Sequence, residues 1–280
     1  MSNDFGVMQG RLLPKYKGRY QAFPIGMWKY EFELAKECGL DLVEFIFDFN
    51  DSEKNPLMSQ AGINEIISVI QQTGVSVKTI CADYFMEAPL HSNQKSIANN
   101  SWHIMRRVID NAALLGVEDI VIPCVDQSSL KNQECVDRFV SIIRNFIPIL
   151  EKNNINFSLE TDLAPGPFLN LIKRIDSKRV RVNYDIGNSA SMGYNPLEEL
   201  EAYGTIISDI HIKDRMLGGP SVVLGEGNAN FDLFFINLKK YSYKGPFIMQ
   251  AYRDEEGIYV FNKQLIWIKE IMKKVGYEYL

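Results

Sequence analysis

The chain has 280 residues, of which 46% are apolar, and its formal net charge is -5 at pH 7. This length is typical of one (β/α)8 barrel, so we expect a single barrel domain over residues 1–280. The acidic balance and the lack of a basic cluster argue against a nucleic-acid partner and against electrostatic membrane attachment. A small-molecule partner is the class that remains.

The first residues, MSNDFGVMQGRLLPK, do not have the basic and then apolar segments of a signal peptide, and no apolar run approaches the roughly 18 residues of a membrane span. We therefore expect a soluble, cytoplasmic protein. Four cysteines lie far apart without CxxC spacing, which indicates reduced thiols: Cys38, Cys81, Cys124 and Cys135.

Short β-like runs alternate with helical patterns along the whole chain. In the first half, the predicted strands are 5–9, 42–47, 75–82 and 119–125, and the helices that follow them are 27–39, 61–74, 101–116 and 135–153. In the second half, the strands are 156–161, 180–186, 208–214 and 247–252, and the helices are 168–175, 195–204, 231–241 and 262–276. Eight strand-plus-helix units with no chain left over predict a closed (β/α)8 TIM barrel.

Four of the later strands end in a side chain that can bind a metal ion: Glu160 in NFSLET, Asp185 in VRVNYDIGN, His211 in SDIHIKD and Gln250 in PFIMQAY. In each segment the residue directly before the candidate ligand is apolar. Because strand side chains alternate between two faces, the apolar residues should pack outward, and the four candidates should point into the barrel at the C-terminal ends of its strands. Hard oxygen donors with one imidazole suit a divalent ion that keeps open positions. Any one of them alone is more readily explained as a cap, a salt bridge or a core histidine; together they predict a metal site.

These segments, with GVMQGRL at the first strand and LGEGNANFD after the seventh, resemble the sugar phosphate isomerase/epimerase family of xylose isomerase-like TIM barrels. In that family a Glu, an Asp, a His and a final Glu bind one divalent ion, and the two Glu residues act as acid and base. The resemblance places these roles on Glu160, Asp185, His211 and Gln250. It implies Mn2+, with Mg2+, Co2+ or Zn2+ as alternatives, a small sugar or sugar phosphate as substrate, and a homodimer.

Gln250 departs from this family pattern, because an amide oxygen can ligate a metal but is no base at neutral pH. Epimerisation is easiest with a base on each face of an enediolate, whereas a 1,2 aldose–ketose isomerisation can use one. The amide therefore favours isomerisation or a lyase reaction unless another acid substitutes. Four loop carboxylates are candidates by location, although each is equally explained as a capping or turn residue: Glu226, Asp83, Glu87 and Asp126.

Further polar residues follow the predicted strands. Lys213 shares the parity of His211, so it should face the mouth, where it could stabilise an enediolate oxygen or hold a phosphate; the alternative is an ion pair with Asp214 or Glu226. Asn188 stands where many relatives carry a substrate-contacting His. A guanidinium matches phosphate or carboxylate, so three arginines could bind an anionic tail: Arg11, Arg215 and Arg253.

We therefore expect a divalent-metal-dependent isomerase or epimerase of carbohydrate metabolism, acting through a cis-enediolate on a small ketose, its phosphate or a sugar acid. Glu160 would move the proton, with Lys213 and Glu226 as further catalytic candidates. A dehydratase of a polyol or keto acid on the same barrel and a degenerate sugar-binding protein are the alternatives. An AP endonuclease is disfavoured, because its trinuclear zinc site needs several histidines and the chain has three.

Overall fold

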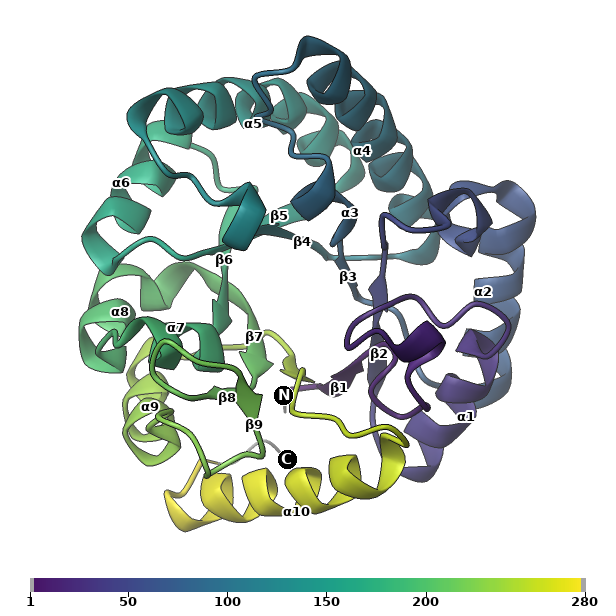
Figure 1. The fold of residues 1–280 in the computed structure, drawn as a ribbon, viewed down its shortest axis with the longest axis vertical. Helices are drawn as coiled ribbons and strands as arrows, with labels where there is room; N and C mark the ends of the chain where they lie inside the picture. The colour runs from purple at the N-terminus through teal and green to yellow at the C-terminus, as the bar shows by residue number, and fades with distance from the viewer. Residues whose placement is uncertain (1–2, 278–280) are drawn as a thin grey trace.

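The computed structural model describes residues 3–277 as a closed barrel of eight parallel strands inside a ring of helices (Figure 1). In the order in which they pair around the barrel, the strands are β1 (Phe5–Met8), β10 (Phe247–Met249), β7 (Ile207–Ile212), β6 (Val180–Asp185), β5 (Asn156–Thr161), β4 (Asp119–Cys124), β3 (Thr79–Cys81) and β2 (Leu42–Ile46). Every pair in this ring is parallel. The predicted (β/α)8 TIM barrel is confirmed.

The outer helices are α1 (Trp28–Glu37), α2 (Gln60–Thr73), α4 (Lys95–Leu115), α5 (Gln133–Asn153), α6 (Pro165–Ile175), α8 (Pro196–Tyr203), α9 (Phe231–Leu238) and α10 (Ile258–Lys274). Shorter elements absent from the prediction are α3 (Tyr84–Glu87), α7 (Ile186–Met192) and the antiparallel pair β8 (Asp214–Arg215) and β9 (Ser221–Val222). Short 3-10 helices cover Tyr16–Gly18, Ser52–Lys54, Pro56–Met58, Asp126–Ser128, Gly204–Ile206 and Lys239–Tyr241. Several of these lie in the loops that follow barrel strands, so they shape its C-terminal mouth.

In each strand, alternate side chains are apolar, and these side chains pack against the outer helices. Phe157 of β5 meets Phe146 of α5 with ring centroids 5.5 Å apart, and Tyr184 of β6 stacks on Phe234 of α9 at 4.8 Å. Because strand side chains alternate, the residues between them face the barrel interior. This packing is what turns the polar strand-end side chains toward one another.

Helix ends and thiols follow the sequence pattern. Gly74 and Gly116 adopt left-handed φ values of 78° and 74° directly after α2 and α4, as a glycine helix stop requires.

All four cysteines are free. Among the described residues, none of the helices has the length and apolar character needed to cross a bilayer.

Candidate active site

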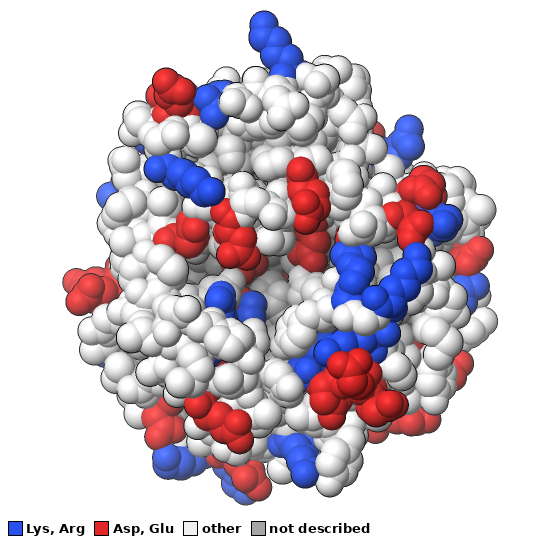
Figure 2. All heavy atoms as spheres, viewed as in Figure 1, with Lys and Arg blue, Asp and Glu red and all other residues white. Residues whose placement is uncertain are grey.

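A polar cavity of about 360 Å³ opens at the C-terminal ends of the strands. Figure 2 shows this hollow near the centre of the face, with acidic and basic side chains around it. Its lining combines six carboxylates with three cationic side chains: Arg19, Gln21, Asp48, Asp83, Met86, Glu87, Pro123, Val125, Asp126, Glu160, Asp162, Asn188, Ser191, Met192, Lys213, Arg215 and Gln250.

Three of the four predicted metal ligands converge at one edge of this cavity, whose lining includes one of them, Glu160. Glu160, Asp185 and His211 each offer one ligand atom, and these atoms lie within 4.8 Å of one another. Asp185 and His211 are direct neighbours in the register of β6 and β7, and all three side chains are buried. Two carboxylates and an imidazole at this spacing have the ligand types and the proximity that a divalent ion requires.

His211 is held by a carboxylate that the sequence analysis missed. Neither ring nitrogen has a hydrogen-bond partner by geometry among residues 3–277, but Nε2 lies 2.9 Å from Oε1 of Glu44 on β2 as an ion pair, whereas Nδ1 lies 3.9 Å from Oδ2 of Asp185. Burial alone lowers the pKa of His211, but the charge of Glu44 outweighs it and raises this pKa to about 10. Nδ1, on the side of Asp185, is therefore the ring nitrogen without a close carboxylate.

Gln250 joins this group through Lys213. The ammonium of Lys213 lies 3.2 Å from Oδ2 of Asp185 and donates to Oε1 of Gln250 at 3.1 Å. Lys213 thus faces the mouth, as its parity predicts, and its acidic partner is Asp185 instead of Asp214 or Glu226. A cation bound between Asp185 and Gln250 would share these two oxygens with the ammonium.

Glu160 lies in a hydrogen-bonded row that runs to the edge of the cavity. Asn188 donates through Nδ2 to Oε1 of Glu160, and Arg215 donates through Nη1 to Oδ1 of Asn188 at 2.8 Å. Burial, and then the neighbouring charge of Asp185, raise the pKa of Glu160 to about 7. A carboxyl group with that pKa can accept and release a proton near neutral pH.

Two of the arginines expected to hold an anionic tail are directed elsewhere. Arg253 donates to the main-chain oxygens of Gly10 at 2.6 Å and Leu13 at 2.5 Å, and Arg11 donates to Oε1 of Gln21 at 2.8 Å. Both side chains are buried and neither lines the cavity. They hold the loop between β1 and α1 in place, so of the three predicted arginines only Arg215 reaches the cavity.

Glu226 is also placed away from the cavity. The carboxylate of Asp214 accepts the main-chain N–H groups of Gly225, Gly227 and Ala229, which wraps this loop around Asp214. The side chain of Glu226 is exposed and is not part of the lining. The expectation that Glu226 is catalytic has no support in this geometry.

Other cavity residues have little or no signal in the sequence. Arg19 and Gln21 come from the irregular loop after β1, and Arg19 pairs with both carboxylate oxygens of Asp48, at 2.5 and 2.9 Å.

The sequence does carry a signal for Glu44, because it is a charged residue with inward parity inside the apolar strand LVEFI. Asp209, 3.9 Å from Nε2 of His211, shares the inward parity of its strand in the same way.

These features define a single (β/α)8 barrel with its polar cavity at the C-terminal ends of the strands, where barrel enzymes carry out their chemistry. The chain belongs to the xylose isomerase-like TIM barrel family, whose model matches residues 32–271.

Relatives in this family are similar over nearly their full length. The L-ribulose-5-phosphate 3-epimerase UlaE of Escherichia coli is 26% identical over 269 residues, covering 91% of this chain and 94% of its own. SgbU of Haemophilus influenzae, provisionally named for the same activity, is 28% identical over 271 residues, covering 89% and 93%. The structure of the IOLI protein with a bound zinc atom is 16% identical, with a TM-score of 0.77 and 99% of each chain covered. At that identity the structural likeness shows the fold alone.

Proposed function

We propose that this protein is a divalent-metal-dependent isomerase or epimerase that acts on a small ketose or ketose phosphate through an enediolate. The observation that carries the proposal is the convergence of Glu160, Asp185 and His211, whose ligand atoms lie within 4.8 Å of one another. The unpartnered, buried Nδ1 of His211 supports a cation there, because a buried polar atom without a partner is costly. Gln250 would complete the set through its amide oxygen.

An ion bound by these residues would supply a Lewis acid that polarises adjacent hydroxyl and carbonyl oxygens of the substrate. Among candidate ions we favour Mn2+, because oxygen donors with one imidazole suit it, with Mg2+, Co2+ and Zn2+ as alternatives. The zinc atom bound to the IOLI protein is consistent with cation binding on this fold.

The side chains around the ion have separable tasks in this proposal. Glu160 removes the proton from the carbon next to the carbonyl, and its pKa of about 7 suits a base at neutral pH. Asn188 orients Glu160 and, with Arg215, is placed to contact substrate hydroxyl groups. Lys213 supplies positive charge beside the oxygen that becomes negative in the enediolate.

The size and polarity of the cavity support a small, highly hydroxylated substrate. Relatives named as L-ribulose-5-phosphate 3-epimerases indicate a ketose phosphate, and the solved structures include one named as an L-ribulose 3-epimerase. Lys213 contacts Asp185 and Arg215 contacts Asn188, so these are the two cationic side chains that we propose for a phosphate or an enediolate oxygen.

The proposal is tested by stripping the protein with a chelator, reconstituting it with Mn2+, Mg2+, Co2+ or Zn2+, and assaying L-ribulose 5-phosphate, L-ribulose and D-fructose. His211→Ala should lose most bound metal and all activity, whereas the matched control His103→Ala, at an exposed position on α4, should lose neither. Unchanged metal content in His211→Ala would contradict the metal site. Sugar binding without turnover would point to a binding protein.

A further inference from the structure

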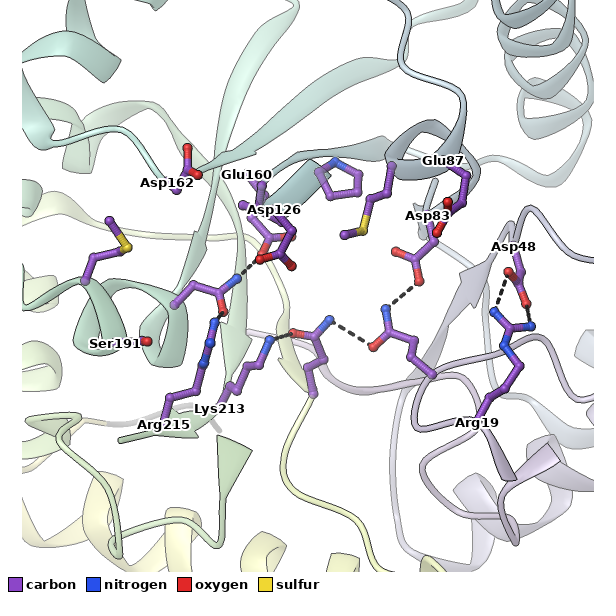
Figure 3. Close-up of a pocket in the computed structure, with 17 residues that line it drawn as sticks. Arg19, Asp48, Asp83, Glu87, Asp126, Glu160, Asp162, Ser191, Lys213 and Arg215 are labelled. Atoms are coloured by element: carbon purple, nitrogen blue, oxygen red, sulfur yellow. Dashed lines mark hydrogen bonds and ion pairs between the residues drawn. The ribbon is translucent and has the colours of Figure 1, made fainter. Parts of the chain in front are cut away.

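Epimerisation needs a proton donor on the face of the enediolate opposite Glu160, and Gln250 is no acid or base. The contacts of Gln250 lead to a carboxyl group elsewhere. Its Nε2 lies 3.4 Å from Oε1 of Gln21, and Nε2 of Gln21 donates to Oδ2 of Asp83 at 2.5 Å. Figure 3 shows this row, which runs from Lys213 through the two amides to Asp83. The row ends at a carboxyl group on β3's side of the cavity.

Asp83 is held in place by two donors and does not serve as a helix cap. Besides Gln21, the thiol of Cys81 donates to Oδ1 of Asp83 at 3.1 Å. Although Asp83 precedes the short helix α3, its side chain makes no capping hydrogen bond. Helix capping, the structural alternative to a catalytic role, therefore does not account for Asp83.

Apart from Asp162, the other carboxylates of the lining pair with an arginine or are exposed. Asp48 is bound by both terminal nitrogens of Arg19, and Asp162 accepts from the hydroxyl of Ser129 at 2.8 Å. The remaining two, Glu87 and Asp126, are exposed. Apart from Glu160, Asp83 and Asp162 are thus the carboxyl groups of the described lining that are partly buried and have no cationic partner, and of these two Asp83 is the one linked to Gln250 through Gln21.

We propose that Asp83 is the second proton-transfer residue, which replaces the carboxylate that Gln250 lacks and makes the protein a 3-epimerase. This inference rests on the proposed function, since it assumes that Glu160 is the first such residue. Figure 3 shows both carboxyl groups pointing into the cavity from different sides. Burial raises the pKa of Asp83 against the lowering effect of its donors, which favours the protonated form that a proton donor requires.

The proposed reaction balances without any oxidant. In one direction the carboxylate of Glu160 takes the C3 proton as the C–H bond breaks, and the electron pair is delocalised into the enediolate. The protonated Asp83 then gives its proton to C3 on the opposite face, so one C–H bond forms as one breaks. In the reverse direction the two residues exchange roles, and exchange with solvent restores their starting protonation.

The test compares Asp83→Asn with wild-type protein loaded with Mn2+, in D2O, using L-ribulose 5-phosphate and L-ribulose and their C3 epimers as substrates. Because only one face keeps its base, the variant should lose at least about 10²-fold in epimerisation yet still exchange the C3 proton of one epimer. NMR measures both. Metal content and the melting temperature of the variant should match wild type, and Asp83→Glu should recover part of the epimerisation.

Matched controls are Asp110→Asn on α4 and Glu33→Gln on α1, which are exposed and outside the cavity lining and should epimerise at near wild-type rates. The inference is overturned if Asp83→Asn epimerises normally, if it loses exchange from both epimers alike, or if wild-type protein only isomerises between C1 and C2. The last outcome would leave the proposed function standing. Wild-type protein that neither converts nor exchanges any of these sugars would instead overturn the proposed function, and the role of Asp83 with it.

Discussion

Glu44 and His211, from strands on different sides of the barrel, form a fully buried pair in which Oε1 lies 2.9 Å from Nε2. The pair occupies one ring nitrogen of His211 and leaves Nδ1 on the side of Asp185. In metal sites, a carboxylate on the second ring nitrogen of a ligating histidine fixes the tautomer and the orientation of the ring. Glu44 is therefore a positioning residue for the proposed site.

Glu44→Gln should weaken metal binding by about 10- to 100-fold, the range for losing such a partner. The reason is that an amide can turn its oxygen or its nitrogen toward Nε2 and no longer selects one tautomer. Calorimetric titration of the chelator-treated protein with Mn2+ measures the dissociation constant. The exposed Glu33→Gln on α1 is the control. An unchanged dissociation constant in folded Glu44→Gln would show that Glu44 does not position the ligand.

Glu160→Gln should keep the fold and part of the metal affinity but lower turnover by about 10²-fold or more, the scale of general base catalysis. The amide can still offer an oxygen to the ion but cannot accept the substrate proton. Steady-state rates at saturating Mn2+ separate this effect from weaker metal binding. Near-normal turnover would remove Glu160 from the mechanism.

Lys213→Met should bind the divalent ion more tightly than wild type while turning over more slowly. Its ammonium lies against Asp185 and Gln250, so it repels a second cation and competes for the same oxygens. Methionine keeps much of the side-chain volume without the charge. Titration with Mn2+ and rate measurements on the same preparations check both halves. Weaker metal binding in this variant would mean that Lys213 supports the ion instead of opposing it.

The stability of the chelator-treated protein should fall as pH rises from about 5 to 8. Burial raises the pKa of Glu31 and Glu160 from 4.5 to about 7, and that of Asp119 from 3.8 to about 6. Between these values the folded state holds more protons than the unfolded state, so the free energy of unfolding decreases with pH. Melting temperatures by circular dichroism test this, and Glu31→Gln should flatten the slope. A melting temperature that rises over this range would refute the sign.

The amino-acid sequence determined the barrel and the floor of the site. The alternation of strand and helix patterns, and the parity of side chains within each strand, are local properties. They were sufficient to predict that Glu160, Asp185, His211 and the neighbouring Lys213 lie close together. Which face a side chain takes in a strand depends only on its position in that strand, so the sequence pattern and the structure agree there.

Tertiary structure alone decided which loop residues reach the cavity. Arg11 and Arg253 turn to the main chain of the loop after β1, and Glu226 turns to solvent because its segment wraps around Asp214. Asp83 is fixed by Gln21, 62 residues away in the sequence. Such outcomes depend on the path of irregular loops and on contacts between residues distant in the chain, and no local periodicity encodes either of them.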